Sequence, residues 1–165
     1  MRVTLEPATA EDAEAIASLR NEVARHLTSR YGKGPGSGNV SSRGVLHDMK
    51  MLSVHVARAD GAVIATLTLG TRKPWAIDKA YFSACERPLY LTSMAVAPEL
   101  QRRGIGRRCL DEAKSIARAW PGDMIRLDAF DAASGAGEFY RKYGFREVGR
   151  ASYRGTPLIY FELAV

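Results

Sequence analysis

The sequence predicts an α+β (mixed α/β) fold in which helices flank one mixed β-sheet. Apolar residues recur with a helical period in some segments and alternate, or run together, in short segments elsewhere. These segments follow one another in the order α-α-β-β-β-α-β-α-β-β, which implies a single sheet with helices on its faces. With 46% hydrophobic and 25% charged residues, the 165 residues fit a single globular domain over 1–165.

The N-terminal part predicts two helices separated by a loop. Thr9 and Asp12 resemble a capping box, which opens a helix that is expected to run to about Arg30. Its apolar face would carry Ala13, Ile16, Leu19, Val23 and Leu27. Residues 33–44 (KGPGSGNVSSRG) are rich in glycine and serine and predict a mobile loop, of a kind that often covers a substrate. A short helix is expected at about 45–51.

A hairpin and an irregular connection follow. Strands are predicted over 52–58 and 62–71, with a turn at Asp60-Gly61. Residues 72–88 have no clear period and carry Trp75, Tyr81 and Phe82. These aromatic side chains could line a pocket or pack into the core, and the sequence leaves both alternatives open.

The C-terminal part alternates between strands and helices, and its breaks coincide with proline or glycine. The predicted elements are a strand at 89–96, a helix at 105–119, a strand at 124–130, a short helix from the 135–137 turn to Tyr143, and a hairpin of strands 145–153 and 158–163.

The segment Gln101–Gly106 (QRRGIG) predicts an anion-binding turn. It lies at the start of the 105–119 helix, where backbone N–H groups lack partners and the helix dipole is positive. Four arginines crowd this helix end, although each cation there costs up to about 1 kcal/mol in isolation. They are Arg102, Arg103, Arg107 and Arg108. The glycine spacing fits neither the dinucleotide-binding fingerprint nor the Walker motif, because Cys109 replaces the third glycine and no GK[ST] follows.

Two motifs together resemble the GNAT superfamily of acyl-CoA-dependent N-acyltransferases. They are LTSMAVAPELQRRGIG (91–106) and GEFYRKYGF (137–145), and the resemblance spans roughly residues 89–165. It implies a central, mostly antiparallel sheet flanked by helices, acetyl-CoA as co-substrate, and acetyl transfer to an amine.

The resemblance also implies residue roles on the cofactor side. The backbone of Gln101, Arg102, Arg103, Gly104, Ile105 and Gly106 would hold the pyrophosphate of CoA, with Arg107 nearby. The main chain of Met94, Ala95 and Val96 would contact pantetheine, and the Met94 amide would polarise the acyl carbonyl. Tyr140 would protonate the departing thiolate, since a phenol of pKa about 10 can donate to a thiolate whose conjugate acid titrates near 8.5. Alternatively, Tyr140 belongs only to the apolar face of a short helix.

The acceptor side departs from the family pattern. Many relatives carry Glu or His at the positions of Tyr90 and Thr92, and neither Tyr nor Thr is a good base at neutral pH. Asp128 is a speculative base and could instead bind a cationic substrate, but a solvated strand residue is the favoured interpretation. A base acting through water is a further alternative. Residues expected to line the acceptor cleft are Tyr31, Trp75, Tyr81, Phe82, Tyr90 and Thr92. An aromatic cleft suits a small-molecule amine that attacks directly in a ternary complex.

Composition limits the other function classes. Only the net charge of +6 supports nucleic-acid binding. Because the basic residues cluster at the glycine turn, no nucleic-acid partner is expected. His26, His47 and His55 lack ligand spacing, and Cys85 and Cys109 match no paired motif, so no metal is expected. No apolar run suggests a membrane span or signal peptide, which predicts a cytoplasmic protein without a membrane partner.

Two alternative functions stay open from the sequence. One is acetylation of a protein or peptide amine, and the other is a non-catalytic acyl-CoA-binding sensor domain. A homodimer is among the oligomeric states compatible with the sequence.

Overall fold

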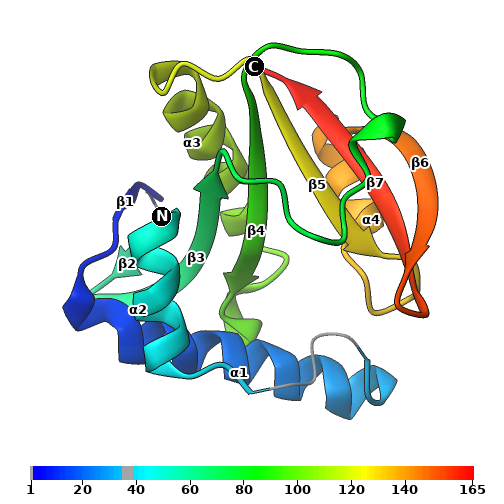
Figure 1. Ribbon diagram of the computed structural model, residues 1–165. Helices are drawn as coiled ribbons and strands as arrows, with labels where there is room; N and C mark the ends of the chain where they lie inside the picture. Colours follow the sequence, from blue (N-terminus) through cyan, green and yellow to red (C-terminus); the bar gives the residue numbers. More distant parts are fainter. Residues whose placement is uncertain (1, 35–38) are drawn as a thin grey trace.

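A computed structural model describes residues 2–34 and 39–165 and shows a mixed sheet with helices on both faces (Figure 1). The sheet has seven strands in the order β1-β2-β3-β4-β5-β7-β6. The strands are β1 (Leu5–Pro7), β2 (Ser53–Ala59), β3 (Ala62–Gly70), β4 (Pro88–Val96), β5 (Met124–Phe130), β6 (Arg146–Tyr153) and β7 (Thr156–Ala164). The α-helices are α1 (Ala13–Tyr31), α2 (Ser42–Met51), α3 (Ile105–Ala119) and α4 (Gly137–Tyr143). Neighbouring strands are antiparallel except β4 and β5, which confirms the predicted fold class.

The two faces of the sheet bury separate apolar clusters. Helices α1 and α2 cover β2 and β3 on one face, where Ile16, Val45 and Val56 pack together. Helices α3 and α4 lie on the other face, over a larger core that includes Leu110 and Phe161. Both clusters follow from the alternation of side chains along each strand.

Most predicted elements form close to their expected bounds, and α3 and β5 match them. Helix α2 begins at Ser42, three residues earlier than expected, because the Ser41 hydroxyl accepts a hydrogen bond from the Gly44 amide at 3.0 Å. The predicted 33–44 loop therefore ends at residue 41, and its residues 35–38 lie outside the described part of the chain. Strand β1 was not predicted, since three residues are too short for a periodic pattern.

Strands β4 and β5 separate along their length. They pair in parallel only where Pro88–Tyr90 meets Met124–Arg126, and they diverge beyond Tyr90 and Arg126 (Figure 1). Strand β4 also carries a bulge: Thr68 pairs with Thr92 and Thr66 with Ala95, so β4 holds one residue more than β3. Ser93, in the bulge, has a positive φ of 53°. The divergence opens the sheet beside the bulge.

Candidate active site

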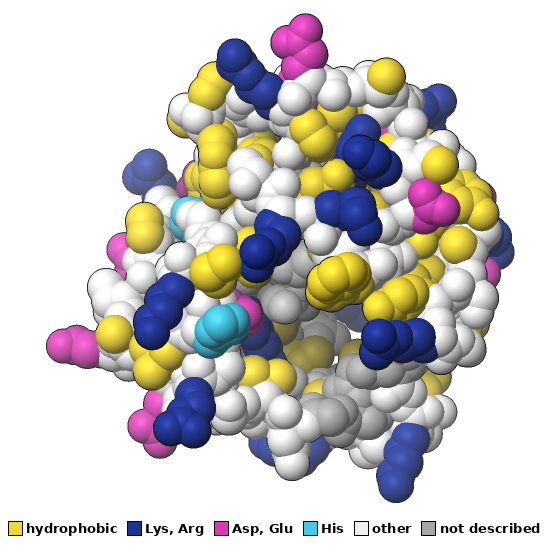
Figure 2. Space-filling model, viewed as in Figure 1, with side chains coloured by type: hydrophobic (Ala, Val, Ile, Leu, Met, Phe, Trp, Pro, Cys, Tyr) yellow, Lys and Arg dark blue, Asp and Glu magenta, His cyan; other side chains and the backbone are white. Residues whose placement is uncertain are grey.

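A cavity of about 290 Å³ lies in the opening between β4 and β5. Thr92, Ser93 and Met94 of β4 form one wall, and residues 128–130 of β5 form the wall opposite. The C-terminal half of α1 contributes Ala24, Leu27 and Thr28, and the remaining lining residues are Gly32, Gly34, Leu91, Ser134, Gly135, Ala136 and Tyr140. Figure 2 shows the surface hollowed on this face, in the lower centre of the view.

Tyr140 is held by an aromatic cluster beneath the cavity. Its ring lies 5.2 Å from Phe139, 5.4 Å from Phe145 and 6.0 Å from Phe161, measured between ring centroids. The hydroxyl points toward β4, where it lies 3.9 Å from the Met94 sulfur. Burial, and to a lesser extent the charge of Asp128, raises the pKa of the Tyr140 phenol well above its usual range. The phenol is therefore protonated at neutral pH and available as a proton donor.

Asp128 faces the cavity rather than bulk water. Leu127 and Ala129, its neighbours on β5, are buried on the α3 and α4 face, so Asp128 lies on the opposite face and lines the cavity. Burial raises the pKa of this carboxyl. The favoured interpretation from the sequence, a solvated strand residue, is wrong, because the divergence of β4 and β5 places this position in a recess.

The glycine turn reaches α3 through a left-handed backbone. Gly104 precedes the helix with φ 80°, and Arg102 also has a positive φ of 62°. A Cβ on Gly104 would meet no described atom within 4 Å, so its backbone conformation is what requires glycine. Gly106 is different, because a Cβ there would lie 3.1 Å from the Phe139 ring. Gly104 is therefore required by its backbone conformation, and Gly106 by its packing against Phe139.

The arginines of the turn are exposed around the helix start. Arg102, Arg103 and Arg107 lie on the surface, next to the first-turn amides of α3. Arg107 also lies over the Tyr143 ring at 5.5 Å. The Gln101 side chain donates to the Val96 carbonyl at 3.1 Å, which ties the turn to the end of β4. Exposed cations and helix N-terminal amides on one turn suit a diphosphate.

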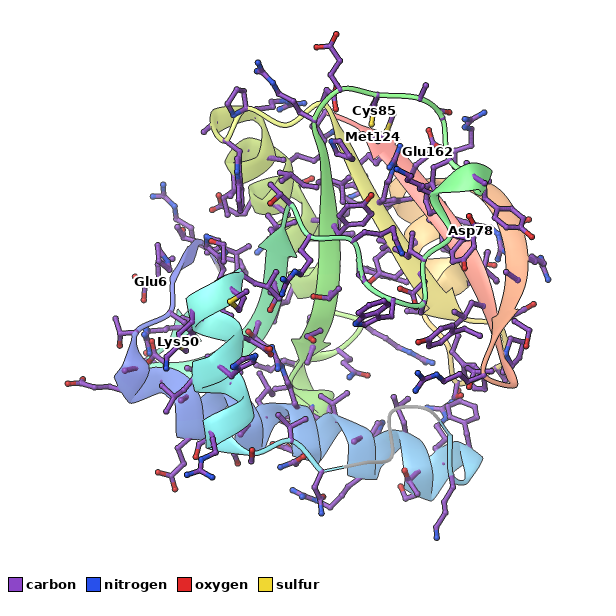
Figure 3. The ribbon with its side chains drawn as sticks, in the orientation of Figure 1. Glu6, Lys50, Asp78, Cys85, Met124 and Glu162 are labelled. Atoms are coloured by element: carbon purple, nitrogen blue, oxygen red, sulfur yellow. The ribbon has the colours of Figure 1, made fainter. Side chains whose placement is uncertain are left out.

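Several residues predicted to line the acceptor cleft lie elsewhere. Tyr90 and Phe82 are buried in a cluster with Tyr160, which agrees with the core-packing alternative for Phe82. The Tyr90 hydroxyl accepts a hydrogen bond from Arg126 at 3.0 Å, at the point where β4 and β5 separate. A second Arg126 nitrogen donates to Cys85, which lies near Glu162 at the end of the sheet far from α1 (Figure 3).

The exposed aromatic residues are also absent from the cavity lining. Tyr31 is 45% exposed, Trp75 89% and Tyr81 42%, and none lines this cavity. Thr92 is the one predicted acceptor residue that does. Sequence reasoning missed the contribution of α1, although the predicted apolar face of that helix already included Leu27. Nothing in the sequence indicated that α1 would cross below the opening between β4 and β5.

Metal-binding groups and membrane-spanning helices are both absent from the described part of the chain. Within residues 2–34 and 39–165, no three His, Cys, Asp or Glu side chains gather into a metal-binding group. No helix in this part of the chain has the length and apolar character needed to cross a membrane.

The sequence and the fold are similar to those of known acetyltransferases. The chain matches a family model described as an acetyltransferase (GNAT) domain over residues 51–147. An N-acetyltransferase from Staphylococcus aureus Mu50 is 16% identical, with a TM-score of 0.72 and 99% of each chain covered. PaiA N-acetyltransferase from Thermoplasma acidophilum, solved with coenzyme A, is 17% identical, with a TM-score of 0.74 and 97% of this chain and 98% of that chain covered.

A third solved structure is that of YncA, a putative acetyltransferase from Salmonella typhimurium, with its cofactor acetyl-CoA. It is 17% identical, with a TM-score of 0.71 and 98% of this chain and 93% of that chain covered. At these identities the solved structures establish the fold, and the family model, which matches more than half of the chain, establishes the family. The chain therefore belongs to the GNAT family of acetyltransferases.

Proposed function

We propose that the protein is an acetyl-CoA-dependent N-acetyltransferase that acetylates the primary amine of a small molecule by direct attack in a ternary complex. The observation that carries this proposal is the cavity between β4 and β5. A protonated phenol and a desolvated carboxylate meet there, beside a strand edge that β5 leaves unpaired. When bound, acetyl-CoA supplies the acetyl group as an activated thioester.

The turn before α3 holds the diphosphate of CoA in this proposal. Backbone amides of Gln101–Gly106 donate to its oxygens, while Arg102, Arg103 and Arg107 offset its charge. The left-handed backbone at Arg102 and Gly104 supports this role, because it allows the turn to wrap closely around an anion. Met94, Ala95 and Val96 present main-chain groups along the opening of the sheet to the pantetheine arm.

Met94 and Tyr140 serve the two ends of the reacting bond. The Met94 amide donates to the acyl oxygen, on which negative charge develops during attack. The Tyr140 hydroxyl gives its proton to the departing thiolate. The Met94 sulfur lies 3.9 Å from this hydroxyl, which supports the assignment, because both residues act on one small group of atoms.

Asp128 orients the acceptor and receives its proton. A carboxylate binds the ammonium form of an amine, and burial makes this carboxylate more basic than one in water. Thr92, on the facing wall, provides a hydroxyl close to the bulge. The small volume of the cavity, about 290 Å³ between α1 and residues 134–136, favours a small molecule over a peptide.

A thiol-release assay tests this proposal. Acetyl-CoA is supplied with a panel of small primary amines and with lysine-containing peptides, and mass spectrometry identifies the product. The expected result is release of CoA thiol together with an N-acetylated small amine. Turnover confined to peptides contradicts the small-molecule assignment. Tight acetyl-CoA binding without turnover of any amine contradicts catalysis and indicates a sensor domain.

A further inference from the structure

We propose that Arg20 binds a carboxylate on the acceptor, so that the substrate class is amino acids and closely related amines that carry a carboxylate. This inference rests on the proposed function, because it concerns the acceptor of the same reaction. It starts from a buried guanidinium that the fold leaves incompletely paired beside the acceptor cavity.

Arg20 belongs to α1, and only 9% of its side chain is exposed. A guanidinium carries five N–H donors, and burying it is unfavourable unless they find acceptors. One terminal nitrogen donates to the Thr68 hydroxyl at 3.3 Å. The other terminal nitrogen lies 3.7 Å from the Asp48 carboxylate, and this distance is too long for a strong hydrogen bond. The Nε atom is buried and finds no acceptor among the described residues.

The charge of Arg20 is therefore only partly compensated by the protein. Burial lowers the pKa of its guanidinium, and the nearby Asp48 carboxylate opposes this effect only in part. The Asp48 side chain is itself 36% exposed, so water weakens its attraction for the guanidinium. An additional anion would satisfy donors that the folded chain leaves unused.

The guanidinium lies next to the acceptor side of the cavity. Thr68, which it contacts, is paired with Thr92 across β3 and β4, and Thr92 lines the cavity. Ala24 lies one helical turn beyond Arg20 on the same face of α1, and it also lines the cavity. Arg20 does not itself line the cavity: its contact with Thr68 places the guanidinium at the β3 side, next to Thr92 in the cavity wall, and Asp48 of α2 lies 3.7 Å from it.

Arg20 and Asp128 lie on opposite sides of β4 and carry opposite charges. Among the described residues that line the cavity, Asp128 is the one that carries a charge. It comes from β5, so about 10 Å or more separates its strand from β3. An acceptor with an ammonium group and a carboxylate can reach both, with the ammonium at Asp128 and the carboxylate at Arg20. A simple alkylamine would leave the guanidinium unsatisfied, which disfavours it.

The test compares acceptors that differ only in the carboxylate. The protein with bound CoA is titrated with standard amino acids and, separately, with the amines of the same chain length that lack the carboxylate. Binding is measured by calorimetry, and turnover of the same compounds is measured with acetyl-CoA. At least one amino acid is expected to bind tenfold or more tightly than its decarboxylated partner.

Two variants then locate the carboxylate. Arg20→Gln is expected to weaken binding of the preferred amino acid about 10- to 100-fold, as expected for hydrogen bonds to a charged group, and to leave the decarboxylated amine and acetyl-CoA unaffected. Asp48→Asn removes the competing anion and is expected to tighten amino-acid binding several-fold. Arg43→Gln, an exposed arginine on α2, is the matched control and should change neither affinity.

The outcomes separate this inference from the proposed function. Preference for decarboxylated amines, or equal weakening of both compounds by Arg20→Gln, shows that Arg20 is only a structural link and overturns the inference. If Arg20→Gln does not fold, unchanged or weaker amino-acid binding in Asp48→Asn overturns it as well. Binding that depends on Arg20 without any turnover supports the inference and refutes the catalytic proposal instead.

Discussion

Tyr140→Phe should separate catalysis from stability. The substitution removes one hydroxyl and keeps the ring in its cluster with Phe139, Phe145 and Phe161. Within the described part of the chain, the hydrogen-bonding contact of that hydroxyl is the Met94 sulfur at 3.9 Å, a weak acceptor. Its loss should therefore change the free energy of unfolding by only about 0.5 kcal/mol, the low end of the range for a hydrogen bond.

The effect on the rate should be much larger. A positioned general acid contributes about 10²- to 10⁴-fold, which corresponds to roughly 3 to 5 kcal/mol of barrier height. The kcat for acetyl transfer should fall by that factor, while the KM for acetyl-CoA stays unchanged, because the phosphate turn and the pantetheine edge are untouched. Thiol-release kinetics and thermal denaturation of the same preparations measure the two effects.

Tyr143→Phe is the matched control from the same helix. Its hydroxyl donates to the Asp111 carboxylate at 2.7 Å, outside the cavity. Removing it should cost about 1 kcal/mol of stability and leave kcat unchanged. Retention of full kcat by Tyr140→Phe, or equal loss of rate in both variants, would refute the role given to Tyr140.

Three further substitutions test other parts of the site. Asp128→Asn should lower kcat and raise stability at pH 7. Burial raises the pKa of Asp128, so the folded state binds the carboxyl proton more readily than the unfolded chain does. At pH 7 the ionised carboxylate therefore destabilises the fold, and the neutral amide removes that cost. The stability gain should vanish as the pH falls below the usual carboxyl pKa of 3.8, and a less stable variant in thermal denaturation at pH 7 contradicts the reasoning. Gly106→Val should raise the KM for acetyl-CoA and lower kcat, because its Cβ would meet Phe139 at 3.1 Å and displace the ring next to Tyr140. Unchanged kinetics would show that Phe139 relaxes freely. Tyr90→Phe should destabilise the fold by about 1–3 kcal/mol, because it removes an acceptor from the buried Arg126, and should spare the transfer rate; a rate loss at full stability argues against a structural role.

The sequence predicts well what depends on local pattern. Helix α3 and strand β5 have strong periodicity and breaks at both ends, so their bounds are confirmed. The mixed sheet follows from element order. Strand β1 is missed, because it is held by pairing with β2 rather than by its own three residues. The early start of α2 depends on one capping hydroxyl inside a segment that otherwise favours a loop.

The acceptor side could not be predicted, because it depends on distant contacts. Tyr90 and Phe82 are buried in a cluster with Tyr160. The Tyr160 hydroxyl accepts a hydrogen bond from the Asp78 amide at 3.3 Å, which fixes the segment between β3 and β4 against β7. Asp128 enters a recess only because β4 and β5 pair over three residues and then part. Arg20 lies next to apolar positions of α1, and no local signal distinguishes its burial from ordinary exposure.

The extra residue at Ser93 reverses the phase of β4. Before it, Leu89 and Leu91 point into the core shared with α3, whereas Thr92 lines the cavity. After it, Ala95 packs against Leu19 of α1, so Met94 falls on the side of Tyr140. In a strand of regular alternation, Met94 would share the side of Thr92. Deleting this one residue would place Met94 directly after Thr92, where alternation still keeps it on the side of Tyr140, but it would remove the bulge that shapes the cavity wall. A length change at this point therefore alters the site even where the fold survives.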